Sequence, residues 1–402
     1  MSQQPISRSP DLKRLRDDGF EVEISSGYLL IHGVPYVAAR GDGREIIEVK
    51  TATLASELTL SGDVTTRPGT HVALWTGDQP CNRNGTEIIQ IKHSISDAKL
   101  GEGLVAKHSF SNKPNGGYGD YYQKMTVYID IISHPAQSID PKVTARTFRV
   151  VESNEEESVY KYLDTASSRA EIGAMSEKLG GTRIGIVGLG GTGSYVLDLI
   201  AKTPVKEIHL YDGDKFLQHN AFRAPGASSI EKLRESPQKV NYFRDIYLQM
   251  RKNVIAHDGF LSPANIGLLD DLDFAFLCLE GGDAKKPIIE RLEQRGIPFI
   301  DVGMGIEIVE ESKQLIGIVR VTTCTNQKRD HVGNRISLGE SYGQGIYGRN
   351  IQIADLNALN AALAVIKWKK LRGFYQDIAS EHHSTFSINT NVLTNEEIVD
   401  GC

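Results

Sequence analysis

A glycine-rich turn is the first place in this sequence where residue types and spacing point to chemistry. The segment 185–194 reads GIVGLGGTGS, in which four glycines fall within six residues: Gly188, Gly190, Gly191 and Gly193. An apolar run precedes them and the amphipathic run SYVLDLIAKT follows, which predicts a buried strand, a tight turn and a helix start. Backbone N–H groups at such a helix start attract anions, so we predict that a nucleotide phosphate binds here. A purely structural turn is the alternative, because glycine suits any turn with positive φ.

An acidic residue follows at the end of the next predicted strand, in EIHLYDGD. Asp212 lies 24 residues after Gly188, close to the spacing of about 20 residues at which a carboxylate binds ribose hydroxyl groups. The alternative is a loop aspartate that caps a turn. Both features suit either a dinucleotide or ATP, and on them alone an NAD-linked dehydrogenase is the default interpretation.

The residues that follow distinguish between these two nucleotides. The segment DGDKFLQHNAFRAPGA contains Asp214, Asn220 and Arg223, and Lys239 stands at a predicted helix start in SPQKV. A dehydrogenase needs no arginine and lysine beside the pyrophosphate, whereas adenylyl transfer does. A carboxylate that attacks the α-phosphorus approaches an anionic group, and fixed cations with Mg²⁺ offset the charge that develops. The alternative is that Arg223 and Lys239 are ordinary solvated cations.

In this order and spacing, the motifs resemble those of the ThiF/MoeB family, the adenylating core of the ubiquitin-activating enzymes. That family shows Gly-x-Gly-Gly-x-Gly, Asp-x-Asp, Asn-x-x-Arg and a lysine, which this sequence matches at 188–193, 212–214, 220–223 and Lys239. The resemblance spans roughly residues 166–375. It implies an α/β fold with a Rossmann-like, doubly wound, mostly parallel sheet. It also implies a homodimeric enzyme that uses ATP and Mg²⁺ to adenylate the C-terminal glycine of a ubiquitin-like protein and releases pyrophosphate.

The resemblance implies a role for each matching residue. Lys239 would stabilise the transition state and Asp212 would hold the ribose. Arg223 would reach the phosphates, either within its own chain or across the homodimer. For Mg²⁺, the family normally has an aspartate where this chain has Glu280, and Asp283 is the nearby second candidate. The remaining residues would bind the phosphates: Gly188, Gly190, Gly191, Gly193, Asp214 and Asn220. The attacking C-terminal carboxylate has a pKa of about 3.5 and is ionised at neutral pH, so no general base is required.

The sequence contains four widely spaced cysteines, and many relatives pass the acyl group to a cysteine thiolate as a thioester. We predict Cys324 as that nucleophile, because it ends the predicted strand IGIVRV close to Lys328 and Arg329, which would lower its pKa. An exposed, unreactive thiol is the alternative. The other cysteines are weaker candidates: Cys278 in an apolar strand, Cys81 in a loop and Cys402 at the last position. MoeB-like proteins have paired zinc cysteines after this strand, and this chain departs from them by having one cysteine there. Two alternatives to Cys324 therefore stay open: the reaction stops at the adenylate, or a thiol from elsewhere accepts the acyl group.

A separate, smaller β-rich α+β domain is predicted for residues 1–150. FEVEI and YLLIHGVPYVAA read as a hairpin that turns at 25–27, and KMTVYIDIISH is a further strand candidate. The charged stretch around 151–165 is the expected linker, 166–375 the adenylation domain, and 376–402 a polar, peripheral tail. By analogy with the family, the first domain would hold the ubiquitin-like substrate or a ubiquitin-conjugating-type partner.

Composition excludes two classes of partner and leaves two other functions open. The net charge is −6 with the basic residues scattered, which argues against nucleic acid. The longest apolar run near the end, AALAVI, is too short to span a bilayer, and neither a signal core nor a CxxC pair is present, so we expect a cytoplasmic protein. The first of the two other functions is a catalytically silent adaptor, one half of a heterodimeric activating enzyme, which would not need Asp212, Arg223 and Lys239 together. An NAD-dependent oxidoreductase would leave Arg223 and Lys239 unexplained.

Overall fold

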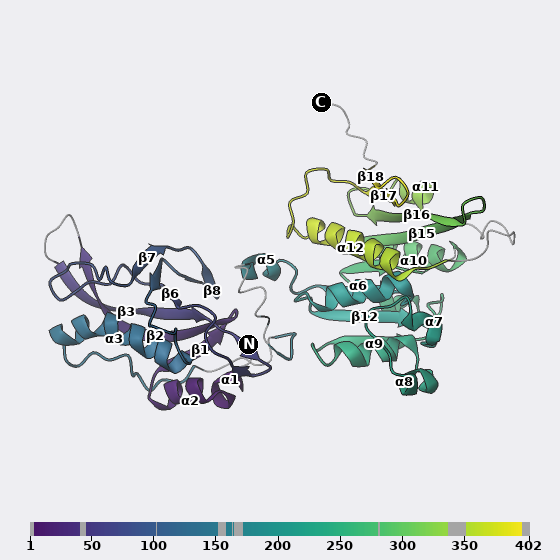
Figure 1. The fold of residues 1–402 in the computed structure, drawn as a ribbon. Helices are drawn as coiled ribbons and strands as arrows, with labels where there is room; N and C mark the ends of the chain where they lie inside the picture. Colours follow the sequence, from purple (N-terminus) through teal and green to yellow (C-terminus); the bar gives the residue numbers. More distant parts are fainter. Residues whose placement is uncertain are drawn as a thin grey trace, which may run out of the picture. The chain divides into compact units, whose positions relative to one another are not determined.

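The computed structural model describes residues 4–40, 46–101, 103–151, 158–162, 164, 172–279, 282–336 and 351–395. It divides into two compact units, Met1–Ala174 and Met175–Cys402, and α5 (Gly173–Glu177) crosses the division in sequence. Figure 1 shows the elements of both units. Among the described residues, no helix is long and apolar enough to cross a membrane.

The N-terminal unit is built on an antiparallel sheet. Its strand order is β1 (Glu21–Ser25), β2 (Tyr28–Arg40), β3 (Ile46–Glu57), β6 (Val72–Trp75), β10 (His108–Ser111) and β7 (Lys92–Ile95). Two short pairs accompany it, β4 (Leu60–Ser61) with β5 (Val64–Thr65), and β8 (Lys99–Gly101) with β9 (Leu104–Val105). Its described helices include α1 (Gln4–Arg8), α2 (Pro10–Asp17) and α3 (Tyr121–Ile139), and α3 packs on β2 (Figure 1). The expected β1–β2 hairpin is present, and Ser26 and Gly27 both have the positive φ of a tight two-residue turn.

One predicted strand of this unit is a helix. KMTVYIDIISH lies inside α3, so the strand prediction is wrong. Its β-branched residues favour a strand, but the Asp120 side chain accepts a hydrogen bond from the Gln123 backbone N–H at 2.7 Å and caps a helix start. The buried positions then recur every three or four residues: Tyr121, Lys124, Met125, Tyr128, Ile129, Ile132, Ser133 and Ala136. Packing of this face on the sheet overrides the local β preference.

A fully buried lysine lies on that packed face of α3. Lys124 Nζ donates hydrogen bonds to Ser56 Oγ at 2.8 Å and to the carbonyl oxygens of Thr70 at 2.9 Å and Val72 at 2.7 Å. No carboxylate accepts from it among these bonds, and burial lowers the pKa of Lys124 to about 7. The charged form is therefore disfavoured in the folded state near neutral pH.

This shift predicts that the N-terminal unit becomes more stable as the pH rises above about 7. In the unfolded chain the lysine keeps its proton up to a pKa of about 10.4, so unfolding takes up a proton between these values. The free energy of unfolding should rise by roughly 1 kcal/mol per pH unit within this window. Urea unfolding at several pH values measures this free energy. Trp75 fluorescence reports on the N-terminal unit once the other tryptophan is removed by Trp368→Phe. Lys124→Met should abolish the rise and the exposed-site control Lys142→Met should keep it; equal slopes in the two variants would contradict the assignment.

The C-terminal unit is built on a mixed sheet whose first part is parallel. β13 (Val254–Asp258), β12 (Glu207–Asp212), β11 (Arg183–Val187), β14 (Phe274–Leu277) and β15 (Phe299–Val309) run parallel in that order. An antiparallel extension continues it with β16 (Gln314–Cys324), β17 (His383–Ser387) and β18 (Val392–Asn395). The predicted peripheral tail therefore contributes two strands, and its last residues, 396–402, lie outside the described part of the chain.

Helices cover both faces of this sheet, as the doubly wound class requires. The residues Ile184 and Ile186 of β11 share one core with α6 (Gly191–Ala201), α9 (Lys239–Tyr247) and α12 (Ala354–Leu371). Val187, on the opposite face, packs with η1 (Ile266–Leu269) and α10 (Gly282–Arg295). The short helices α7 (Gln218–Ala221), α8 (Ile230–Glu235) and α11 (Val332–Arg335) complete the unit. The predicted α/β fold class, with a β-rich unit before it, is confirmed.

Candidate functional site

The glycine turn joins β11 to α6 at the carboxyl edge of the parallel strands. Gly188 follows the last residue of β11 and has φ +89°, and a Cβ at this position would lie 2.8 Å from the Cys278 carbonyl oxygen. A Cβ on Gly193 would overlap the Gly188 carbonyl oxygen. Gly188 and Gly193 must therefore be glycine, because another part of the backbone occupies the space of a Cβ atom. The resulting tight turn leaves the N-terminus of α6 accessible to an anion.

The carboxylate of Asp212 fastens this turn to the next strand. Asp212 ends β12, is 8% exposed, and its Oδ2 accepts from the Leu189 backbone N–H at 2.6 Å. Its Oδ1 accepts from the Asp214 backbone N–H at 2.8 Å. The residue therefore holds the glycine turn in place, a function that the sequence did not reveal. Its predicted contact with a ribose remains a prediction.

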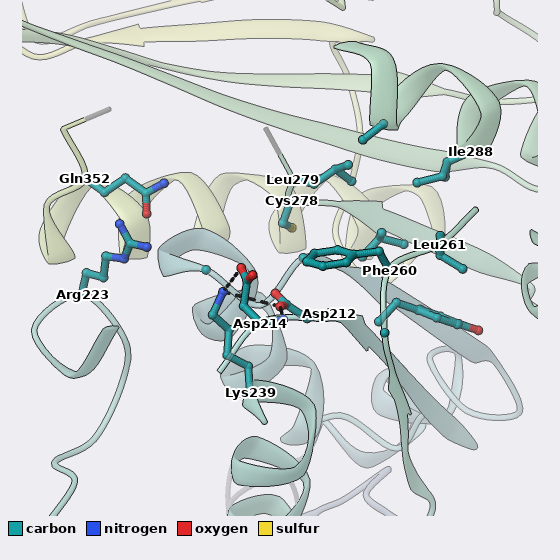
Figure 2. A pocket seen from close by; sticks show the side chains of 16 residues that line it. Asp212, Asp214, Arg223, Lys239, Phe260, Leu261, Cys278, Leu279, Ile288 and Gln352 are labelled. Atoms are coloured by element: carbon teal, nitrogen blue, oxygen red, sulfur yellow. Dashed lines mark hydrogen bonds and ion pairs between the residues drawn. The ribbon is translucent and has the colours of Figure 1, made fainter. Parts of the chain in front are cut away.

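Lys239 lies between two carboxylates at the start of α9 (Figure 2). Its Nζ is 2.7 Å from Asp214 Oδ2 and 3.5 Å from Asp212 Oδ1. The Lys239 side chain is 7% exposed, whereas that of Asp214 is 58% exposed. A buried ammonium group held by one buried and one solvated carboxylate is a fixed cation that can exchange its solvated partner for a phosphate.

Asn220 and Arg223 flank the turn from the segment around α7. Asn220 Oδ1 accepts from the Leu217 backbone N–H at 2.9 Å and so organises the start of this helix. Two buried donor atoms here, Asn220 Nδ2 and Arg223 Nε, have no hydrogen-bond partner among the residues that the structure describes. Buried donors without acceptors cost free energy, so the environment of these two side chains suits an anion.

These elements enclose a cavity of about 330 Å³, within the size range of small-molecule sites. It gathers six of the predicted residues: Gly188, Gly190, Asp212, Asp214, Arg223 and Lys239. Gly191, Gly193 and Asn220 do not line it but support those that do. Figure 2 shows Arg223 and Gln352 at one side of this pocket, and Leu261 and Ile288 at the other. The cavity thus has a polar, cationic end and an apolar end.

Sequence reasoning missed the residues that form the apolar end and part of the polar end. Phe260 and Leu261 follow the carboxyl end of β13, where ligands of open α/β sheets bind, so their position was a usable signal. Phe260 is 69% exposed, and a Cβ on Gly213 would lie 2.8 Å from its ring. Gln352 enters from the segment before α12, far along the chain, and no local pattern marks it.

The structure contradicts the predicted environment of Cys324. Cys324 ends β16 and pairs with Phe299, the first residue of β15, so it lies at the amino edge of the parallel strands. The glycine turn lies at the opposite edge. Burial raises the pKa of the Cys324 thiol to about 12 although Arg329 acts in the other direction, and the side chain is 0% exposed. The Arg329 guanidinium instead donates to the carbonyl oxygens of Thr325 and Glu293.

The other cysteines differ in position. Cys278 follows β14 and lines the cavity, and burial raises the pKa of its thiol. Cys81 is buried in the N-terminal unit, and burial raises its pKa as well. Cys402 lies outside the described residues. None of the three described thiols is therefore poised as a thiolate in this conformation.

The predicted metal ligands fall where the structure gives no side-chain description. Glu280 lies outside the described residues, and Asp283 belongs to α10 without a described side chain. Within the described ranges, no group of three or more His, Cys, Asp or Glu side chains is arranged to hold a metal ion. The Mg²⁺ assignment therefore remains a prediction.

Comparisons with known proteins identify two family domains along the chain. A model of the ThiF family matches residues 166–308, and residues 10–165 match a domain of unknown function, DUF6791. No curated protein matches the chain.

Among solved structures, PaaA is 21% identical with a TM-score of 0.45, over 56% of this chain and 75% of PaaA. E. coli MccB with succinimide is 16% identical with a TM-score of 0.44, over 57% of this chain and 70% of MccB. The ATP complex of E. coli MccB is 17% identical with a TM-score of 0.41, over 56% of this chain and 66% of MccB. Residues 166–308 therefore form a ThiF family domain, and this is the family that the glycine, aspartate, arginine and lysine motifs of the chain resemble.

Proposed function

We propose that this protein uses ATP to adenylate the C-terminal glycine carboxylate of a ubiquitin-like protein. The observation that carries the proposal is the convergence of the glycine turn, Arg223 and Lys239 on one cavity of a ThiF family domain. In this proposal the adenine base occupies the apolar end beside Phe260 and Ile288. The triphosphate lies at the cationic end, against the N-terminus of α6.

The chemistry requires charge stabilisation more than proton transfer. The carboxylate attacks the α-phosphorus of ATP, a new bond joins the carboxylate oxygen to phosphorus, and the bond to the α,β-bridging oxygen breaks. Pyrophosphate leaves with that electron pair, and an acyl adenylate remains. Negative charge grows on the phosphoryl oxygens, and Arg223 and Lys239 supply fixed positive charge there. Mg²⁺, when bound, would neutralise the leaving pyrophosphate.

The ion pairs of Lys239 prepare it for this task. The solvated Asp214 carboxylate is its closest partner, so an α-phosphate can replace Asp214 without leaving the ammonium group unpaired. The buried Asp212 keeps two backbone N–H donors throughout and continues to hold the turn. The Lys239 ammonium group can thus pair with the negative charge that develops on the α-phosphate, while Asp212 keeps the glycine turn in place.

The proposal ends at the acyl adenylate and assigns no thioester to Cys324, which lies at the other edge of the sheet. In this proposal a thiol of a ubiquitin-conjugating-type partner accepts the acyl group, because burial raises the pKa of each described thiol of this chain. Arg223 lines the cavity of its own chain, which supports an arginine supplied within one subunit. Homodimer formation, and substrate or partner binding by the N-terminal unit, remain predictions that light scattering and pull-down with the isolated ubiquitin-like protein test.

Pyrophosphate exchange into ATP tests the proposal directly. Exchange should appear only when a ubiquitin-like protein with a free C-terminal glycine is added, with candidates taken from the same genome. The matched control is the same protein with an amidated C-terminus, which folds identically but has no attacking carboxylate. Exchange with both forms would mean that the carboxylate is not the nucleophile. Binding of NAD instead of ATP would replace the proposal with the oxidoreductase.

A further inference from the structure

The helix α12 buries two asparagines that the proposed chemistry does not use. Asn357 and Asn360 are both 0% exposed, one helical turn apart, in a helix that packs along α6 (Figure 1). Asn360 Nδ2 donates to the Gly303 carbonyl oxygen of β15 at 2.9 Å. Burying a carboxamide costs free energy unless its polar atoms are hydrogen-bonded, so the bonds that it makes indicate which segments it holds. Asn360 Oδ1 has no partner among the described residues, whereas both polar atoms of Asn357 are bonded.

Asn357 contacts two segments of the proposed triphosphate site. Its Oδ1 accepts from Thr192 Oγ1 at 3.0 Å, in the first turn of α6. Its Nδ2 donates to the Arg223 carbonyl oxygen at 3.5 Å, a long bond. A Cβ on Gly191 would overlap this carboxamide, so Asn357 fills the space that the third glycine leaves open. One side chain from α12 therefore touches both the glycine turn and the backbone that carries the Arg223 guanidinium.

We propose that Asn357 is a positioning residue for nucleotide phosphate: it fixes the N-terminus of α6 and the Arg223 segment relative to each other. The inference rests on the proposed function, because it names the residue that aligns the two anion-binding groups of that site. Preorganised donors bind a phosphate far better than donors that must be ordered at the moment of binding. Asn357 itself does not line the cavity, so its effect on ligands must act through Thr192 and Arg223.

A matched pair of variants on α12 separates positioning from stability. Asn357→Leu and Asn360→Leu each replace an equally buried asparagine by a side chain of similar size. The first removes the partner of Thr192 Oγ1 and of the Arg223 carbonyl oxygen, and the second removes the partner of the Gly303 carbonyl oxygen. We expect both to lower the unfolding temperature, while only Asn357→Leu weakens binding of Mg·ATP, by about tenfold or more in titration calorimetry. Thr192→Val, which removes one hydroxyl group, should weaken binding in the same direction, and the double variant with Asn357→Leu should lose little more.

The outcomes distinguish this inference from the proposed function. If the unmodified protein fails to bind ATP, the proposed function is wrong and the inference falls with it. If it binds ATP and Asn357→Leu binds equally well, or if both leucine variants lose affinity equally, Asn357 is a structural residue only. Should Asn357→Leu not fold, Thr192→Val decides: unchanged affinity overturns the inference. Loss of affinity without any pyrophosphate exchange would support the positioning role and leave the acyl substrate to be identified.

Discussion

Replacing Lys239 by alanine is expected to reduce pyrophosphate exchange into ATP by about 10² to 10³-fold, as removal of a single preorganised charge-stabilising group does in other enzymes. The fall should appear in kcat more than in KM for ATP, because the ammonium group serves charge that grows in the transition state. The fold should persist, since the buried Asp212 carboxylate keeps its backbone donors at Leu189 and Asp214.

The control for this variant is another lysine with an ion pair. Lys232 Nζ lies 2.7 Å from Glu235 Oε2 on the exposed helix α8, where a salt bridge contributes little. Lys232→Ala should exchange pyrophosphate at the unmodified rate. If Lys239→Ala did so as well, its role in adenylyl transfer would be wrong, whatever its contribution to stability.

Replacing Gly193 by alanine is expected to remove nucleotide binding, with a loss of affinity of about 100-fold or more. The added Cβ would overlap the Gly188 carbonyl oxygen, and a backbone atom inside a tight turn cannot move away as a flexible side chain can. The turn must open, and opening it misaligns the N–H groups at the start of α6. A 100-fold loss of affinity corresponds to about 3 kcal/mol of binding free energy, which is the upper end of the usual cost of overpacking.

Gly267→Ala is the matched control, because a Cβ there meets no atom within 4 Å and its φ is not positive. Its ATP affinity in calorimetry should equal that of the unmodified protein, and its unfolding temperature should be unchanged or slightly higher. Equal ATP affinity in Gly193→Ala would show that the glycine turn does not contact the phosphates.

The parts of this site that local sequence could predict are those that local backbone geometry determines. Each of these parts lies where a strand ends or a helix begins: the glycine turn after β11, Asp212 at the end of β12, and Lys239 at the start of α9. The order of the elements alone therefore determines at which edge of the sheet they lie. Asn220 and Arg223 belong to the same short excursion from β12 to α9. Sequence order was enough to bring these segments together at one edge of the sheet, where Asp212, Arg223 and Lys239 line the cavity and Asn220 supports it.

The failures share a different cause. The β-branched residues of α3 suggest a strand, and only the spacing of its buried side chains, set by the sheet beneath, reveals the helix. Cys324 ends a strand, as predicted, but β16 runs antiparallel to β15, and this reversal places its end at the amino edge. Nothing local distinguishes a reversed strand from a parallel one. Asn357 reaches Thr192 across 165 positions, so only the folded chain shows that contact.

The reach of α12 back to the first turn of α6 has a consequence for biosynthesis. A ribosome releases the glycine turn long before it makes the helix that covers α6, and at roughly 5–20 residues per second the delay is on the order of ten seconds. During this interval the face of α6 that packs against α12 is uncovered. The fragment 166–308 lacks α12, so the same face of α6 would stay uncovered in it. From the proposed role of Asn357, we expect the nascent chain to bind nucleotide only after translation has passed α12.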